Sequence, residues 1–185
     1  MGSRLLRSAR LGLLILVLPP AASVTLAKPV AAGPPTSLAD TLPFTSYVVD
    51  QAGVLTREER RRLIDRLGRF QRETGHQMAV ATVDSLAGEQ VAAFSLRLAT
   101  RWGVGRKDAN DGILILLAPQ DRSARIEVGL GLEQRLTNAF CATVISGHMV
   151  PEFAQGRYGS GLERGVTAII AKLASNRAEP NARRR

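Results

Sequence analysis

The chain has 185 residues, of which 45% are hydrophobic, and its formal net charge at pH 7 is +9. A single cysteine, Cys141, excludes an internal disulfide and an N-terminal lipoprotein anchor, so the hydrophobic core alone must hold the fold together. Basic and acidic residues alternate, as in the run 57–60, which is typical of a solvated helix face and argues against nucleic acid as a partner.

The first 27 residues are typical of an export signal. Arg4, Arg7 and Arg10 precede a short apolar run, residues 11–18, which is too short to span a bilayer. Small residues at positions 25 and 27 predict cleavage after Ala27, with an uncleaved N-terminal anchor as the alternative. We therefore expect a protein exported to the periplasm or to the extracytoplasmic face of the membrane. Without the three arginines the net charge is +6, which supports at most weak contact with an anionic membrane surface.

Composition divides the rest of the chain into three parts. Residues 28–46 are rich in Pro, Ala, Ser and Thr and are predicted to form a linker. Residues 174–185 are predicted to be a disordered basic tail. Residues 47–173 remain for one domain, a length that is sufficient for a single hydrophobic core.

The first half of this domain is predicted to alternate between strands and helices. A β-prone run over 47–50 precedes a helix that begins at the capping box of Thr56 and Glu59 and ends at Gly75. Residues 77–83 are apolar without a period of two, which is expected of a strand buried on both faces.

The second half begins with a helix over 89–102 and a polar, glycine-rich loop over 103–112. Strands are predicted over 113–118 and 125–128, and the short connection between them allows only a hairpin. Two further helices are expected, one from 137 or 138 to Pro151, which ends it, and one over 158–173.

This order of elements predicts the fold class. Helices between the early strands indicate parallel pairing through right-handed crossovers, with helices on both faces of the sheet. The sequence therefore predicts an α/β fold: a three-layer α/β/α sandwich with a mixed, mostly parallel central sheet and a hairpin at one side.

No complete catalytic motif is found in the sequence. The glycine pairs at 103–105 and 129–131 lack the third glycine of a dinucleotide loop, and neither a phosphate-binding P-loop nor a Gly-x-Ser-x-Gly elbow occurs. Cys141 is expected on an inner helix face, because a cysteine phosphatase needs an arginine where Gly147 stands. His76 and His148 are expected to be surface or capping residues, and two histidines with no cysteine partner argue against a zinc site.

Oxygen-bearing side chains recur in the predicted loops. Carboxylate and amide oxygens suit a hard cation such as calcium or magnesium, and loops at one edge of an α/β sheet can bring such ligands together. The alternative is that these residues serve only as turn and cap residues. The residues are Asp50, Asp84, Asp108, Asn110, Asp111, Glu133 and Asn138.

Five short segments, in order and at fitting intervals, resemble the TPM domain family. The similarity extends over essentially all of residues 47–173. The segments are Tyr47-Val48-Val49-Asp50 with Ala52-Gly53-Val54-Leu55; Trp102-Gly103 with Gly105; Asn110 with Gly112-Ile113-Leu114; Arg125 to Glu133 with Leu136-Thr137; and Pro151 with Phe153, Gly156 and Tyr158.

The resemblance implies a three-layer α/β sandwich in exported or lumenal proteins. The family includes a thylakoid-lumen protein of photosystem II repair and an auxiliary protein of an animal acetylcholine receptor, and acid phosphatase activity and calcium binding have been attributed to members. By position, the resemblance favours a cation or phosphate site that uses Asp50, Asn110, Asp111 and Glu133. Asn138 stands where the family usually has Asp, and the lost charge should weaken the affinity for a cation.

Two functions follow as expectations. The first is an accessory or binding module for the assembly or turnover of an envelope or membrane protein complex, with a calcium or magnesium site formed by Asp50, Asn110, Asp111, Glu133 and Asn138. The alternative is a metal-assisted acid phosphatase of the TPM type, in which Asp50 or Asp111 is catalytic and orients water or attacks the phosphoryl group. A purely structural role is the third interpretation.

Overall fold

A four-stranded mixed sheet organises residues 37–175, the part of the chain that the computed structural model describes. The strands lie in the order β1-β2-β3-β4; the first three are parallel, and β3 and β4 form an antiparallel hairpin at one side. The predicted fold class is thus confirmed. The strands are β1 (Val48–Asp50), β2 (Gln77–Thr82), β3 (Gly112–Ala118) and β4 (Ser123–Val128).

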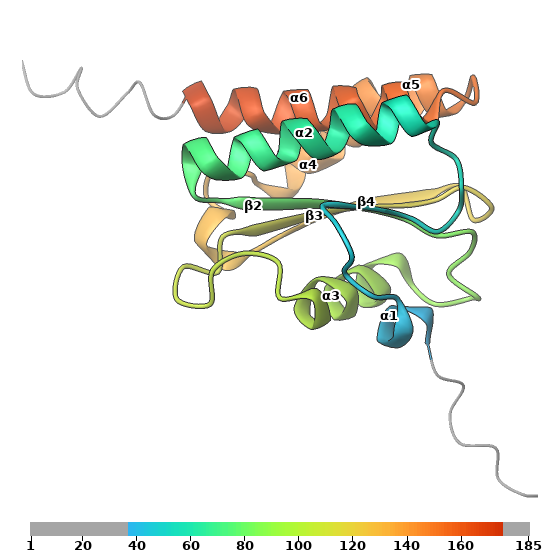
Figure 1. Cartoon of the computed structure of the whole chain (residues 1–185), viewed down its shortest axis with the longest axis horizontal. Coiled ribbons are helices and arrows are strands. Elements are labelled where there is room, and N and C mark those ends of the chain that lie inside the picture. Colours follow the sequence, from blue (N-terminus) through green and yellow to red (C-terminus); the bar gives the residue numbers. More distant parts are fainter. Residues whose placement is uncertain (1–36, 176–185) are drawn as a thin grey trace, which may run out of the picture. The chain divides into compact units, whose positions relative to one another are not determined.

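Helices cover both faces of this sheet (Figure 1). On one face lie α2 (Arg57–Thr74), α4 (Asn138–Val144), α5 (Val150–Phe153) and α6 (Tyr158–Ser175); on the other lie α1 (Leu38–Thr41) and α3 (Val91–Trp102). Alternate side chains of β3 enter two separate hydrophobic clusters, with Ile113 and Ile115 facing α2 and α6, and Leu114 and Leu116 facing α3. The side-chain period of two in a strand thus divides the core into two layers.

The two crossovers between parallel strands have opposite hands. The strand order advances in the same direction from β1 to β2 and from β2 to β3, but α2 and α3 lie on opposite faces. One crossover must therefore be left-handed, and the expectation that both are right-handed is wrong. Long loops on either side of α3, residues 83–90 and 103–111, give the chain the freedom to reach the second face.

The ends of α2 follow the sequence signals. The side chain of Thr56 accepts a hydrogen bond from the backbone N–H of Glu59, and the Glu59 side chain accepts one from the Thr56 backbone. Gly75 ends the helix in the left-handed conformation, at φ +78°. The capping box and the C-terminal glycine are therefore confirmed.

The predicted helix from residue 137 to Pro151 is interrupted. It consists of α4, a π-helical turn η2 (Ile145–Met149) and the short helix α5, and Pro151 lies in the first turn of α5. A proline in a first turn lacks only an N–H that has no partner in the helix, so Pro151 starts a helix here. The prediction that Pro151 ends the helix is wrong.

Residues 37–46, which the sequence assigns to the linker, pack against α3. Ala39 and Leu42 are buried, and Trp102 Nε1 donates to the Leu42 carbonyl oxygen at 2.8 Å. The Phe44 ring lies 5.1 Å from the Trp102 ring, centre to centre. The predicted signal, residues 28–36 and the tail from residue 176 lie outside the described residues. No helix within 37–175 combines the length and apolarity needed to cross a membrane.

Removal of residues 1–46 is expected to lower the free energy of unfolding by about 2–4 kcal/mol, because it exposes the surface under Leu42 and leaves Trp102 Nε1 without its acceptor. Urea denaturation followed by Trp102 fluorescence measures the change. The matched control removes only residues 1–36 and should unfold at the same urea concentration as the full-length chain. Equal midpoints for both truncations would show that this packing contributes nothing.

Candidate functional site

The residues predicted to form one site lie at two opposite edges of the sheet. Asp50 closes β1 and Asp84 follows β2, so both lie where parallel strands end. Asn110 and Asp111 precede β3 and lie where parallel strands begin. Because β4 is antiparallel, the residues that follow it lie at this second edge too: Glu133 and Asn138.

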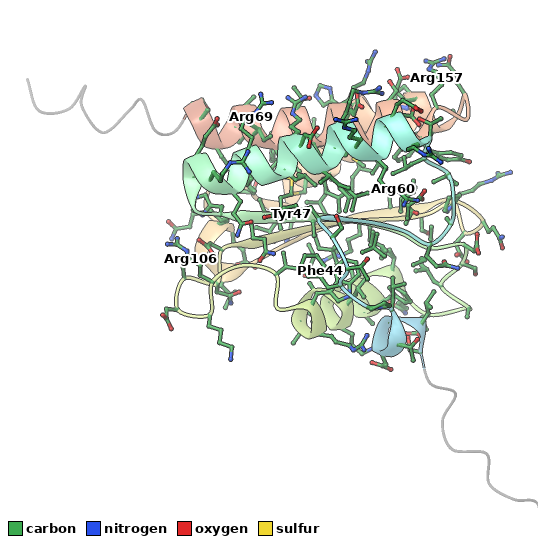
Figure 2. All side chains as sticks on the ribbon, viewed as in Figure 1. Phe44, Tyr47, Arg60, Arg69, Arg106 and Arg157 are labelled. Atoms are coloured by element: carbon green, nitrogen blue, oxygen red, sulfur yellow. The ribbon has the colours of Figure 1, made fainter. Side chains whose placement is uncertain are left out.

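The strand register gives the separation of the two edges. Asp50 pairs with Thr82 at the end of β2, whereas Gly112 pairs with Gln77 at its start. Five strand residues at about 3.3 Å each place the two edges about 16 Å apart. In Figure 2 the arginines that pair with these carboxylates, Arg60 and Arg106, lie toward opposite ends of the sheet. One ion cannot be shared by Asp50 and Asp111, so the prediction of a single five-residue site is wrong.

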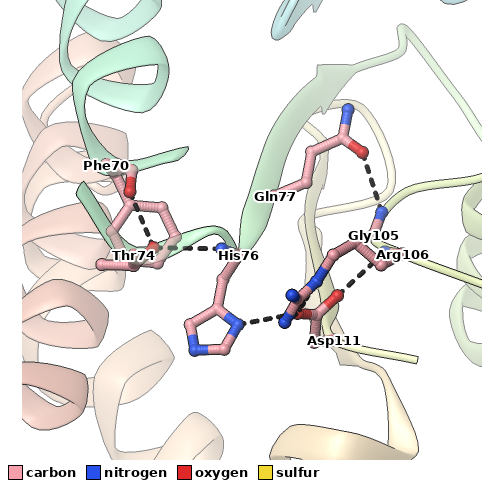
Figure 3. A network of polar contacts seen from close by, with 7 residues as sticks. All are labelled: Phe70, Thr74, His76, Gln77, Gly105, Arg106 and Asp111. Atoms are coloured by element: carbon pink, nitrogen blue, oxygen red, sulfur yellow. Dashed lines mark hydrogen bonds and ion pairs between the residues drawn. The ribbon is translucent and has the colours of Figure 1, made fainter. Parts of the chain in front are cut away.

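Asp111 is the centre of a polar network at the starting edge (Figure 3). Its Oδ1 accepts the backbone N–H of Arg106 at 2.8 Å, and its Oδ2 accepts Nε and Nη2 of the same guanidinium, with Nε at 2.9 Å. His76 Nδ1 lies 2.9 Å from Oδ2. Because an ionised carboxylate only accepts hydrogen bonds, Nδ1 must carry the proton. Both oxygens of Asp111 are thus occupied by groups of the chain itself.

The protonation of Asp111 follows from these contacts. The residue is 2% exposed, and burial by itself raises the pKa of a carboxyl group. The hydrogen bonds from Arg106 and His76 and the charge of Arg106 outweigh burial and hold the pKa of Asp111 at about 2. The carboxylate is therefore ionised at physiological pH, and it is too weak a base to accept a proton from water in catalysis.

The backbone around Asp111 is also closely packed. Gly105 has φ +99°, and a Cβ on it would lie 2.3 Å from the nitrogen of Gly112. The Gly105 N–H donates to Oε1 of Gln77 at 2.8 Å, which attaches the loop to the start of β2 (Figure 3). Asn110 adopts φ +45°, and its carbonyl accepts from the N–H of Gly131. The glycine-rich loop thus needs its glycines for close backbone packing at this edge.

Asp50 has a comparable role at the ending edge. Its side chain is fully buried; Oδ1 accepts from Val54 N at 3.2 Å and from the Thr82 hydroxyl, and Oδ2 accepts from Leu55 N at 3.1 Å. Arg60 Nη2 lies 3.5 Å from Oδ2. The carboxylate thus fixes the turn after β1 and links β1 to β2.

A divalent cation of the kind that the family resemblance implies needs several free oxygen ligands. Asp50 and Asp111 do not provide them, and within residues 37–175 no group of three or more His, Cys, Asp or Glu side chains is placed to hold a metal ion. Asn110 and Glu133 line one hollow, and Glu133 and Asn138 line the adjoining one, so they provide a single carboxylate. The residues present do not fit the predicted site.

Sequence analysis missed two members of the Asp111 network, Arg106 and His76. It expected His76 to be a surface or capping residue, whereas the His76 side chain is 19% exposed and contacts Asp111. A signal was present, because His76 and Asp111 each immediately precede a strand, and β2 and β3 are parallel neighbours.

Cys141 lies on an inner helix face, as expected. It is buried, and burial raises the pKa of its thiol.

Fold and site together define a class: a three-layer α/β/α domain whose two buried aspartates fix the loops at opposite edges of a mixed sheet. The family model of the TPM domain, also named TPM phosphatase, matches residues 48–172. The chain therefore belongs to the TPM domain family.

Solved structures agree with this assignment. The N-terminal domain of a protein from P. gingivalis is 33% identical, with a TM-score of 0.66 over 71% of this chain and 84% of that one. The BA42 protein of Bizionia argentinensis is 21% identical, with a TM-score of 0.57 over 65% and 82%. The N-terminal domain of the cg2496 protein of Corynebacterium glutamicum is 13% identical, with a TM-score of 0.54 over 75% and 86%. The last two show the fold alone. The comparison with curated proteins gives no match.

Proposed function

We propose that this TPM-domain chain is an exported accessory module that binds a component of an envelope or membrane protein complex. One observation carries the proposal: the two aspartates expected to be catalytic, Asp50 and Asp111, use their oxygens to hold the chain's own loops. A nucleophile or general base needs a lone pair directed at the substrate. The arrangement at both sheet edges therefore favours binding over catalysis.

The test combines hydrolysis and complex formation. The purified chain, Asp50→Asn and Asp111→Asn are compared with a generic phosphomonoester, and chemical crosslinking in envelope membranes identifies bound proteins by mass spectrometry. We expect no hydrolysis above background, and one complex that an unrelated exported domain of equal charge does not form. Hydrolysis that falls about 100-fold in a folded Asp111→Asn chain would contradict the proposal.

The export that the proposal requires has a separate readout. Mass spectrometry of the protein purified from the envelope fraction should find a mature N-terminus at Lys28, following cleavage after Ala27. A protein that retains Met1 and stays in the cytosolic fraction would contradict export. An intact N-terminus in the membrane fraction would indicate the anchor instead.

The metal-assisted phosphatase is the second candidate, because the family model that matches the chain is also named for phosphatase activity. In that function the chain's own arginines would orient the phosphoryl group, and a bound cation would supply Lewis-acid chemistry. Hydrolysis that is retained in Asp50→Asn and Asp111→Asn would favour a phosphatase whose catalytic residues lie elsewhere in the chain.

For the cation we propose a reduced set of ligands, Asn110, Glu133 and Asn138, with calcium or magnesium bound weakly. One carboxylate predicts a dissociation constant of about 1 mM or higher, so 1 mM calcium should raise the free energy of unfolding by at most about 0.4 kcal/mol. Thermal unfolding with and without calcium measures this effect. Glu133→Gln should abolish it, and Glu58→Gln, on an exposed face of α2, is the control. A stabilisation of several kcal/mol that requires Asp111 would show that our assignment of its oxygens is wrong.

A further inference from the structure

A basic pocket lies between the C-terminal halves of α2 and α6 and has a volume of about 710 Å³. We call it the α2–α6 pocket. Arginines line it from two directions: Arg62, Arg66 and Arg69 from α2, and Arg135 from the loop after η1 (Leu130–Leu132). Figure 2 labels Arg69 on α2. The pocket shares no side chain with the acidic set from which the cation site was predicted.

The positive charge of the pocket is only partly compensated. Its lining holds two acidic side chains, Asp65 and Glu73, against the four arginines. Arg62 pairs with Glu163 at 2.9 Å, whereas the guanidinium groups of Arg66 and Arg69 make no ion pair or hydrogen bond with any residue of 37–175. Arg66 is also half-buried. Arg69 is exposed, so one partly desolvated cation and one solvated cation, both without an ion pair, lie at this pocket and favour a bound anion.

Arg135 supplies an independent observation. Its Nη2 donates to the carbonyl oxygen of Leu173 and so caps the C-terminal end of α6. Its Nε is buried, and within residues 37–175 it is the one buried side-chain nitrogen or oxygen that has no hydrogen-bond partner. The nitrogen has almost no exposed area, so a ligand oxygen reaches it only when the Arg135 side chain shifts. A buried donor without an acceptor is costly, and this cost favours such a shift when the pocket holds an oxygen-bearing ligand.

The remaining wall of the pocket is apolar. Phe70, Ile170 and Leu173 contribute to it, beside the arginine side chains. His76 also lines it, and its ring is held in place by the bond from Nδ1 to Asp111. A ligand that fits this lining has an anionic group with several oxygens and an adjoining apolar part.

We propose that the α2–α6 pocket binds a phosphate group on an amphiphilic molecule, in contact with Arg66, Arg69 and the free Nε–H of Arg135. Guanidinium groups match phosphate oxygens through paired hydrogen bonds, and the apolar wall contacts the organic part. The phosphate belongs to an anionic lipid headgroup or to a soluble phosphate ester. The proposal is independent of the proposed function, because an accessory module and a phosphatase could both hold a phosphate here.

Inorganic phosphate tests the shared chemistry. It is titrated into the 15N-labelled full-length chain while the Nε–Hε signals of arginine are recorded by NMR. We expect saturable shifts of the Arg135 signal, and a loss of affinity of about tenfold or more in Arg66→Gln/Arg69→Gln. Arg61→Gln/Arg72→Gln is the matched control, with the same charge change on the same helix outside the pocket, and should retain its affinity within about twofold. Arg135→Lys keeps the charge but lacks Nε, and should bind more weakly.

Vesicles distinguish the two sources of the phosphate. Cosedimentation with vesicles of phosphatidylglycerol and phosphatidylcholine is compared with vesicles of phosphatidylcholine alone, which measures any insertion of the apolar N-terminal segment. A lipid headgroup predicts that the anionic vesicles bind the parent chain and the control but not Arg66→Gln/Arg69→Gln, and that phosphate competes. A soluble ester predicts saturable phosphate binding without this lipid dependence.

Two results would overturn the proposal. One is the absence of saturation with phosphate together with no preference for anionic vesicles. The other is equal weakening in both double variants, because net surface charge would then account for all the binding.

Discussion

Asp111→Asn is expected to lower the free energy of unfolding by about 3 kcal/mol. The substitution keeps the shape of the side chain but removes the charge that faces Arg106 and His76, and it leaves one or more of their N–H groups without an acceptor. The effect should fall short of that of a fully buried ion pair, because the Arg106 side chain is 61% exposed and is solvated when its partner is lost.

Urea denaturation measures this change, and Asp108→Asn is the matched control. Asp108 lies in the same loop, is exposed, and makes no hydrogen bond or ion pair within residues 37–175, so its substitution should change stability by less than about 0.5 kcal/mol. Equal stabilities for the two variants would show that the Asp111 network does not hold the loop.

The same network predicts how stability depends on pH. The pKa of Asp111 is about 2 in the folded chain, against 3.8 for an unperturbed aspartate, so the folded state binds the proton less readily than the unfolded state. The resulting stabilisation, about 2 kcal/mol, is fully present above about pH 4 and is lost as the pH falls toward 2. Stability curves should therefore be steeper in this range for the parent chain than for Asp111→Asn. Parallel curves would contradict the low pKa.

Asp50→Ala is the second large effect, with an expected loss of about 3 kcal/mol. It removes the acceptor of Val54 N, Leu55 N and the Thr82 hydroxyl from a fully buried position, and the turn after β1 loses its internal anchor. Chemical denaturation of the purified variant measures the loss.

A double-mutant cycle with Thr82→Val separates the link between β1 and β2 from the turn. We expect a coupling of about 1 kcal/mol between Asp50 and Thr82, because their side chains share one hydrogen bond. If Asp50→Ala changes stability by less than about 0.5 kcal/mol, Asp50 does not anchor the turn, and a role as a free functional carboxylate becomes the better interpretation.

The elements of the fold could largely be predicted from local patterns. The capping box at Thr56 and the glycine at position 75 delimit α2, and the apolar run over 77–83 correctly predicts β2 as a strand buried on both faces. The hand of the crossovers could not be predicted, because it depends on which face of the sheet α3 packs against. The packing of residues 37–46 was missed because their composition is that of a linker, although Leu42 and Phe44 contact Trp102.

The candidate site was predicted less well, although the predicted strands already implied that its two aspartates lie far apart. Asp50 follows a strand and Asp111 precedes one, and in parallel strands these positions lie at opposite edges. Residue type identified the aspartates as important, but it could not show that their oxygens are occupied. The partners of Asp111 are a histidine 35 positions away and an arginine five positions away, and only the paired strands bring the histidine close.

The positive partner of Asp111 belongs to the polypeptide itself. A metal ion at such a place could be removed by a chelator or lost by dilution, but a guanidinium held by its own backbone cannot leave. The order of the glycine-rich loop should therefore not depend on a bound metal ion. Weak binding of calcium at Asn110 would add to an order that already exists, and the loop would keep its conformation before and after that encounter.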